Sequence, residues 1–445
     1  MLSEKEKRVL YLIEENKDEI VKYLRKLISF KTITPPRESM QLESTYMDKS
    51  AGMDIDRGEH RKLQDLVYKT LEEMNFALDI WEIEPSKLIS FPGSGVVPNR
   101  DLSDMPVVVG KLKGDGDGKS LILNGHYDVV PIGVIENWSH DPFKGEIENN
   151  KLFGRGACDM KGGIAAMLMA VKFIQQAGIK LNGDLTVETV PDEEKTSMGT
   201  LACCQKGYKA DAAIIPEPTD MNIYVAMRGN VTGKITVFGR AGHADITQPH
   251  WTEGGAVNAI SKAVKIILAL EELSDDWRKR PDKRHKFLDP DIIIPTLVMG
   301  GEWVITYPEK VDLGFTSNFV PGTVDIKKEI QEKITSVANT DPWMREHPPK
   351  LEANPWLYGA EIDENEPIAK TTIEAAKELR IESKPIGMGS LTDAIHLINY
   401  SKIPTISIGP SIKTAHMANE FVEIDELINT TKVLALAILR WCGHS

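Results

Sequence analysis

Short runs of apolar residues alternate with a helical pattern in the first half of the chain. Apolar positions recur at helical spacing over residues 160–178, and Gly178 marks the end of this helix. Four runs rich in Val, Ile and Leu are typical of buried strands, at residues 107–112, 120–130, 184–190 and 211–217. Strand, helix and strand at this spacing predict an α/β fold with a mostly parallel sheet, and such sheets bind ligands at the carboxyl ends of their strands.

The pattern changes after residue 226, where the order of elements becomes strand, helix, strand, strand, helix. These elements are predicted at residues 233–244, 255–273, 292–300, 310–320 and 324–334. They indicate a small α+β insert, and the chain returns to α/β type from residue 354 onward. We therefore predict a catalytic domain of residues 1–225 and 354–445, interrupted by a smaller domain of residues 226–353.

The long helix of the insert carries an apolar stripe, which predicts that it packs on the sheet of its own domain. The stripe consists of Val257, Ile260, Val264, Ile267 and Leu268. A polar segment, residues 274–291, follows this helix. An amphipathic helix is predicted within residues 1–30, and a loop over residues 37–59.

Composition and charge narrow the class of protein. A length of 445 residues favours two domains, and 41% hydrophobic with 27% charged residues is a globular composition. The net charge of -13 argues against a nucleic-acid partner and against an anionic membrane, since both attract a basic surface. No apolar run is long enough to span a bilayer, no signal peptide is recognisable, and the four cysteines form no CxxC motif. These features predict a cytoplasmic protein.

Histidine and carboxylate residues gather mostly at the ends of the predicted strands. They are His126, Asp128, Asp159, Glu193, Glu194, Glu217 and His416. Donors of this kind without thiolates suit zinc, cobalt or manganese in a catalytic rather than a structural site. Taken singly, each residue is also explained as a solvated side chain or a turn residue, and Asp159 as a helix cap. The pattern alone leaves both a metal site and ordinary surface residues open.

The spacing of these residues suggests separate functions within two pairs. Residues i and i+2 of a strand face the same way, so the Asp128 carboxylate is placed to accept a hydrogen bond from the far ring nitrogen of His126. Adjacent residues face apart. Glu193 and Glu194 are therefore expected to divide two tasks, one binding metal and the other holding a proton near the attacking water.

Six short motifs follow one another through nearly the whole chain: GHYDVVP, WSHDPF, LFGRGACDMKGG, PDEE, PEPT and AHMANEFV. In this order they resemble the M20 metallopeptidase family, and most closely its branch of acetylornithine deacetylase and succinyl-diaminopimelate desuccinylase. The resemblance implies a zinc-peptidase-like catalytic domain whose inserted small domain acts as a lid and as a dimerisation domain. It also implies two divalent metal ions, with zinc as the first choice and cobalt or manganese as alternatives.

The resemblance further implies a function for each matching residue. The residues implied to bind the ions are His126 and Glu217 for one, Glu194 and His416 for the other, with Asp159 bridging both. Glu193 is implied to be the general acid and base, and Asp128 to orient His126. The motif FGRAGHA implies that His243 stabilises the transition state in the active site of the partner within a homodimer. The peptide bond between Asp159 and Met160 is implied to be cis.

One position departs from the family pattern. Relatives that bind a substrate carboxylate often carry Arg shortly before a Pro-Gly in the lid, where this sequence has Asn318 in TSNFVPG. A neutral amide does not form the charge-assisted fork that guanidinium forms with carboxylate, which disfavours an N-acyl α-amino acid substrate. Arg228 and Arg240 either supply the missing positive charge to a substrate carboxylate from another direction or are surface charges. Three lid aromatics are interpreted as lining an acyl or ring pocket or as core residues: Trp251, Trp303 and Tyr307.

These observations predict an enzyme that hydrolyses a linear amide C–N bond of a small N-acyl compound with metal-activated water. An exopeptidase or dipeptidase with the same metals is the alternative within the family. A catalytically silent binding homologue would lack a ligand or the base, and this sequence has all of them. The segment GDGDGKS is one residue short of the GxxxxGK[ST] phosphate loop, which argues against a nucleotide site.

Overall fold

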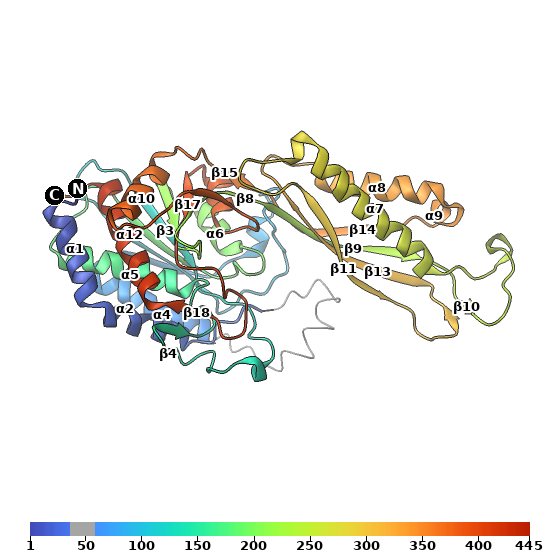
Figure 1. Cartoon of the computed structure of the whole chain (residues 1–445), viewed down its shortest axis with the longest axis horizontal. Helices are drawn as coiled ribbons and strands as arrows, with labels where there is room; N and C mark the ends of the chain where they lie inside the picture. Colours follow the sequence, from blue (N-terminus) through green and yellow to red (C-terminus); the bar gives the residue numbers. More distant parts are fainter. Residues whose placement is uncertain (36–57) are drawn as a thin grey trace.

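The computed structural model describes residues 1–35 and 58–445, which form a larger and a smaller domain lying end to end (Figure 1). The larger domain contains both termini and a nine-stranded sheet, and the smaller domain contains a four-stranded sheet. The chain enters the smaller domain between β8 (Ile223–Met227) and β9 (Gly229–Phe238), and it returns after β14 (Lys350–Leu357). The boundaries given above for the two domains remain a prediction.

The larger sheet has a parallel centre with antiparallel flanks. Its other strands are β1 (Ala77–Trp81), β2 (Val107–Leu112), β3 (Leu121–His126), β6 (Leu185–Val190), β7 (Ala212–Ile215), β15 (Ala360–Glu361), β16 (Pro385–Met388) and β17 (Thr405–Ser407). Their order is β1-β2-β6-β3-β7-β17-β8-β15, with β16 paired to β8. Strands β6, β3, β7 and β17 run parallel, so their carboxyl ends meet at one edge. The predicted α/β fold is confirmed, and the four predicted buried strands are β2, β3, β6 and β7.

Helices cover both faces of this sheet, as its apolar strands require. They are α1 (Glu4–Glu15), α2 (Lys17–Ile28), α4 (Gly58–Glu73), α5 (Lys161–Gln176), α6 (Met198–Lys206), α10 (Pro367–Glu378), α11 (Ala394–His396) and α12 (Ile424–Cys442). Successive residues of β2 enter different clusters: Val108 packs in the core that contains α5 and α12, whereas Val107 and Val109 pack with residues of α6. Burial on both faces explains why these strands are continuously apolar.

The amino-terminal region differs in detail from the prediction. The single helix expected within residues 1–30 is divided into α1 and α2 at Asn16, whose side chain donates to the Leu12 carbonyl at 2.7 Å. Asparagine competes with the helical hydrogen bonds in this way, which the apolar spacing alone does not reveal. The loop expected over residues 37–59 lies outside the described residues as far as residue 57, and Gly58 and Glu59 begin α4.

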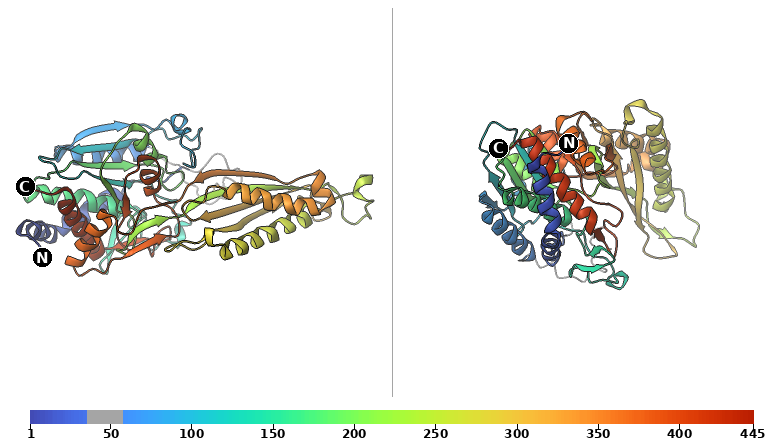
Figure 2. Two further views of the ribbon diagram at one scale, coloured as in Figure 1. Left: turned by 90° about the horizontal axis from the view of Figure 1, so that it is seen from above. Right: turned by 60° about the vertical axis from the view of Figure 1, so that its left-hand side comes forward.

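The smaller domain is an antiparallel sheet with its helices on one face (Figure 2). Its remaining elements are β10 (Gly242–His243), α7 (Ala259–Lys279), β11 (Ile292–Gly300), β12 (Thr306–Tyr307), β13 (Lys310–Phe319), α8 (Ile326–Thr340) and α9 (Pro342–Glu346). The sheet order is β11-β13-β9-β14, and β10 pairs with β12 in a separate ribbon beyond its end. Residues of α7, α8 and the sheet form a core of their own.

Helix α7 packs mainly through a different face from the predicted stripe, of which Val257 and Ile267 pack on the domain core and the other three residues do not. Ile260, Val264 and Leu268 are 46%, 46% and 53% exposed. The residues buried against the domain core are Ala259, Ala263, Ile266, Leu270, Leu273 and Trp277. Both stripes have helical spacing, and alanines on the packed face allow the helix to approach the sheet closely. The helix also continues to Lys279, so the polar segment begins inside it. Among the described residues, no helix is both long and apolar enough to cross a membrane.

Candidate metal centre

The predicted histidines and carboxylates come together at the carboxyl edge of the parallel strands. Their places are His126 at the end of β3, Glu193 and Glu194 after β6, Glu217 after β7, Asp159 before α5 and His416 before β18 (Phe421–Glu423). Parallel strands end at the same edge, so residues far apart in the chain meet there without any loop having to cross the domain. Loops before α5 and β18 supply the two residues that no strand of the parallel centre provides.

These side chains form two groups that can each hold a metal ion. One group is His126, Asp159 and Glu217, the other is Asp159, Glu194 and His416, and the ligand atoms of each group lie within 4.8 Å of one another. Asp159 belongs to both groups. Its Oδ1 lies 3.2 Å from Nε2 of His126, and its Oδ2 lies 3.3 Å from Nε2 of His416. Each oxygen of this carboxylate thus faces a different group.

The charges of the two groups favour an added cation. Burial lowers the pKa of His126, but neighbouring carboxylates, Glu217 first, outweigh burial and hold this pKa well above its usual value. Hydrogen bonds to Asp159 and Glu194 raise the pKa of His416 to about 10. Oε1 of Glu217 is buried and has no hydrogen-bond partner among the described residues. A divalent cation satisfies such an oxygen and offsets the crowding of carboxylates, so this donor set fits a metal site.

Asp128 contacts the centre through different atoms from those predicted. The acceptor facing Nδ1 of His126, at 2.9 Å, is the main-chain carbonyl of Asp128, and the nearest carboxylate oxygen lies 3.7 Å away. The carboxylate instead accepts the N–H groups of Glu193 and Glu194 at 3.2 and 3.4 Å. Strand β3 ends at His126, so the two-residue alternation on which the prediction rested does not extend to Asp128. Asp128 therefore joins the loop of the two glutamates to the end of β3.

The two adjacent glutamates turn to different partners. Oε2 of Glu194 lies 3.1 Å from Nε2 of His416, within the second group. Glu193 belongs to neither group, and its Oε2 lies 3.9 Å from Nε2 of His126. Both carboxylates line a cavity of about 500 Å³ that also borders Asp159, Glu217 and His416. Glu193 is thus placed beside the metal ligands and open to a small molecule in this cavity.

A buried ion pair behind the centre was not predicted. Oε1 of Glu420 accepts the N–H groups of Cys158 and Asp159 at 3.1 and 3.2 Å, and its Oε2 accepts Nη1 of Arg155 at 2.6 Å. The pair links the loop of Asp159 to the loop of His416. Both residues stand inside the quoted motifs GRGACDM and ANEFV, but 265 residues separate them, and no local pattern relates them. The Asp159–Met160 peptide bond is cis, which confirms that prediction.

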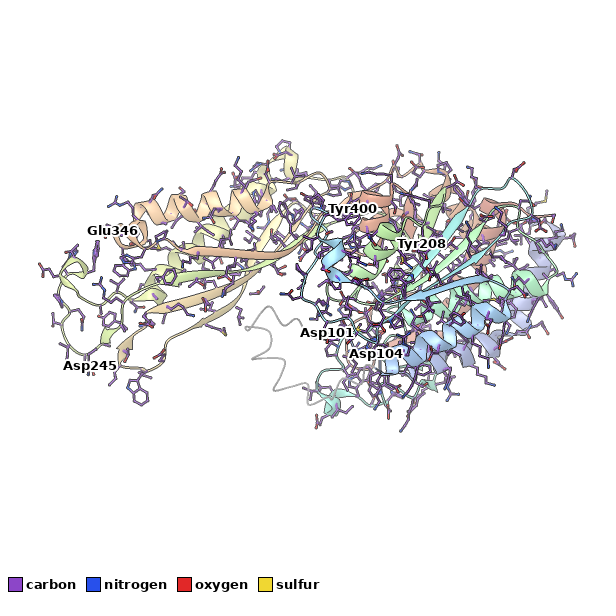
Figure 3. The ribbon with its side chains drawn as sticks, turned by 180° about the vertical axis from the view of Figure 1, so that it is seen from behind. Asp101, Asp104, Tyr208, Asp245, Glu346 and Tyr400 are labelled. Atoms are coloured by element: carbon purple, nitrogen blue, oxygen red, sulfur yellow. The ribbon has the colours of Figure 1, made fainter. Side chains whose placement is uncertain are left out.

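His243 lies far from the metal ligands of its own chain. It stands on β10, at the end of the smaller domain most distant from the larger sheet (Figure 1). Figure 3 labels Asp245 at this tip, well away from Tyr208 and Tyr400 of the larger domain. The Asp245 N–H donates to Nδ1 of His243 at 3.2 Å, so the neutral ring carries its hydrogen on Nε2. The exposed ring presents this Nε2–H as a donor to the outside.

The residues predicted to contact substrate lie outside the lining of the cavity. The guanidinium of Arg228 donates to the Pro290 carbonyl, and Asn318 accepts a hydrogen bond from Asn230 at 2.9 Å. Arg240 donates to the Trp251 and Gly255 carbonyls. The three aromatic residues of the smaller domain also lie outside this lining. Trp251 packs on Trp343, and Trp303 and Tyr307 border a second cavity at the tip of the smaller domain. Asn230, which was not among the predicted site residues, does line the cavity.

A parallel sheet whose carboxyl edge carries two overlapping His and carboxylate groups indicates a metal-dependent enzyme. The model of peptidase family M20/M25/M40 matches residues 122–440, and the chain belongs to this family. It is therefore a hydrolase of amide C–N bonds that uses divalent metal, as its donor groups indicate. The resemblance inferred from the six motifs is confirmed.

Curated relatives and solved structures agree with this family. The chain is 32% identical, over 97% of its length and 96% of the relative, to N-formyl-4-amino-5-aminomethyl-2-methylpyrimidine deformylase of Bacillus subtilis (strain 168). It is 29% identical, with the same coverage, to the deformylase of that name from Halalkalibacterium halodurans. The fold is similar to that of the di-peptidase Dug1p from Saccharomyces cerevisiae, with a TM-score of 0.73, 15% identity and 99% of each chain covered.

Proposed function

We propose that this enzyme is a deformylase of a small N-formyl amine and that it uses two divalent ions, zinc first among them. The observation that carries the two-ion assignment is the division of the Asp159 carboxylate between two donor groups. His126 and Glu217 would complete one site, and Glu194 and His416 the other. Such ions, when bound, lower the pKa of water and polarise the amide carbonyl. All four cysteines are free thiols, which supports a reducing, cytoplasmic setting.

The residues of the chain then divide the remaining chemistry. Glu193, outside both donor groups and lining the cavity, accepts a proton from the attacking water and returns it to the leaving nitrogen. Asp128 holds the Glu193 loop by accepting its N–H groups, and its carbonyl fixes the ring of His126. Nε2–H of a His243 supplied by a second subunit donates to the carbonyl oxygen as negative charge develops on it.

Formyl is the acyl group best supported by the curated relatives. A panel of amides tests this assignment. The panel comprises N-formyl-4-amino-5-aminomethyl-2-methylpyrimidine, its N-acetyl and N-succinyl counterparts, and a dipeptide. We expect the formamide to have the highest kcat/KM and the dipeptide to be at least about tenfold poorer, since no guanidinium lines the described part of the cavity to bind its carboxylate. Preferential hydrolysis of the dipeptide would instead establish the dipeptidase alternative.

We also propose a homodimer formed through the smaller domain. Strand β11 is an outer strand of its sheet, so one row of its main-chain hydrogen-bonding groups meets no other strand of the described chain. Ile260, Val264 and Leu268 on α7 are exposed apolar residues of the same domain. A second copy that covers these elements would stabilise them, and its lid tip would be free to reach the cavity that His243 does not reach in its own chain.

Mixing two inactive variants tests this arrangement. Glu193→Gln lacks the proton acceptor of its own cavity, and His243→Ala lacks the donor that it would supply to a partner. Random exchange of subunits is expected to restore about one quarter of the wild-type activity, since half of the dimers are mixed and each has one complete site. The measurement is amide hydrolysis after mixing, with sedimentation to establish the oligomeric state. Exchange of subunits without any recovered activity would contradict the assignment of His243 to a partner's site.

The buried Arg155–Glu420 pair is expected to set the affinity of the second metal site. Glu420→Gln keeps the shape of the side chain but replaces one carboxylate oxygen by an NH₂ group. This group then faces donors instead of accepting from them, either Arg155 or the N–H groups of Cys158 and Asp159. The lost hydrogen bonds are expected to loosen the Asp159 loop relative to His416. We expect metal affinity at the Asp159, Glu194 and His416 group to fall about tenfold to a hundredfold. Calorimetric metal titration measures this, and exposed Glu423→Gln is the matched control. Unchanged affinity in a folded Glu420→Gln protein would leave the pair with a purely structural function.

A further inference from the structure

Part of the wall of the cavity is uncharged. Apart from the metal-ligand residues, Glu193 and Lys195, the described lining consists of neutral residues, which include Tyr224, Asn230, Met388, Ser390 and Thr392. The cationic types in this lining are a histidine and a lysine: His416, a candidate metal ligand, and Lys195, which follows Glu194 in the chain. A substrate carboxylate placed against the uncharged part of the wall would meet neutral side chains, which cannot offset the cost of removing its charge from water.

Asn230 is held rigidly in this wall by the neighbouring strand. Its Nδ2 donates to Oδ1 of Asn318 at 2.9 Å and to Oγ1 of Thr316 at 3.1 Å, and it lies 3.4 Å from the Ser317 carbonyl oxygen. Asn230 on β9 stands directly opposite Asn318 on β13 in the antiparallel register. A main-chain carbonyl only accepts hydrogen bonds, so its position beside Nδ2 identifies the nitrogen end of the Asn230 amide.

This orientation leaves the other end of the amide for the cavity. Both hydrogens of Nδ2 are engaged by β13, while Oδ1 of Asn230 accepts no hydrogen bond from the described residues. Asn318, predicted from the sequence as a substrate contact, thus acts on Asn230 rather than on the cavity. Arg228, two residues earlier, has its guanidinium directed to the Pro290 carbonyl, is only 6% exposed and is not part of the described lining of the cavity.

We infer that Asn230 is a specificity-determining residue whose Oδ1 accepts a hydrogen bond from an N–H donor on the amine half of the substrate. The substrate class that fits is an uncharged amide whose amine half carries an amino group, rather than an N-acyl amino acid. This inference rests on the proposed amide hydrolysis in the same cavity. The inference assigns selection of the substrate to the smaller domain, because Asn230 lies on β9 whereas the metal ligands all belong to the larger domain.

Two formamides that differ by one amino group test the inference. The probes are the aminopyrimidine formamide of the panel above and its analogue with hydrogen in place of the ring amino group. We expect the wild type to prefer the amino compound by about fivefold to tenfold in kcat/KM, the value of one hydrogen bond. Asn230→Ala is expected to lose this preference by lowering kcat/KM for the amino compound alone, with unchanged metal content. Exposed Asn365→Ala, whose side chain bonds only within its own turn, is the control.

Binding of the free amines to the metal-loaded protein gives a second measurement that needs no turnover. Calorimetry is expected to show the same preference for the amino compound in the wild type and its loss in Asn230→Ala. If Asn230→Ala weakens the binding of both amines equally, or keeps the preference for the amino compound, Asn230 does not accept a hydrogen bond from the amino group and the inference is overturned. Hydrolysis of N-formylmethionine as efficiently as the aminopyrimidine formamide would overturn the preference for uncharged amides. Failure of the wild type to hydrolyse any formamide would refute the proposed function, while the calorimetric preference would still decide the function of Asn230.

Discussion

Removal of divalent metal ions is expected to abolish amide hydrolysis. The expected loss is at least about a thousandfold, because divalent ions lower the pKa of water from about 15.7 to about 7 and no side chain replaces that effect. Zinc, cobalt or manganese added to the stripped protein is expected to restore turnover. The measurement is hydrolysis of the formamide before chelation, after chelation and after each metal is returned, with metal content determined by mass spectrometry.

The stability of the fold should change with the metal as well. The metal-free centre brings together the carboxylates of Asp159, Glu193, Glu194 and Glu217 around His126 and His416. A ligand that binds only the folded state raises the free energy of unfolding, by about 2.7 kcal/mol at a hundredfold excess over its Kd. Asp159→Asn, which alters the ligand of both groups, is expected to lose this stabilisation, whereas exposed Asp101→Asn retains it. Full activity in protein shown to be free of metal would contradict the two-ion proposal.

Replacing Glu193 by Gln is expected to lower kcat by about a hundredfold to ten-thousandfold, the usual contribution of a positioned proton acceptor. Metal content should remain normal, because Glu193 lies outside both donor groups. Glutamine keeps the size of the side chain and the N–H group that Asp128 accepts, so the loop after β6 is retained. The measurements are kcat for the formamide and metal content per chain.

The adjacent residue provides the matched control for this variant. Glu194 lies within hydrogen-bonding distance of His416, and Glu194→Gln is expected to lose the ion of the second group together with activity. The two variants thus separate a proton carrier from a metal ligand at neighbouring positions in the chain. Normal metal content in Glu194→Gln combined with metal loss in Glu193→Gln would reverse the two assignments.

Local patterns in the sequence were sufficient for the sheet and for the set of donors. The apolar runs that became β2, β3, β6 and β7 are buried on both faces, so their composition carries a strong signal. The donors follow these strands, and parallel strands necessarily end at one edge, so His126, Glu194 and Glu217 were predictable as neighbours. The sheet of the smaller domain was only partly predictable, since β14 pairs with β9 across more than a hundred residues and has no distinctive pattern of its own.

What the sequence determined by itself was therefore the identity and order of the donor residues, the α/β class and the family to which they belong. Tertiary structure decided which atoms of those residues act. It placed the Asp128 carbonyl rather than the carboxylate on His126, because β3 ends before Asp128. It also paired Arg155 with Glu420 and turned Asn230 toward the cavity. Hydrogen bonds between distant segments depend on the final separation of atoms, and one-dimensional spacing does not encode that separation.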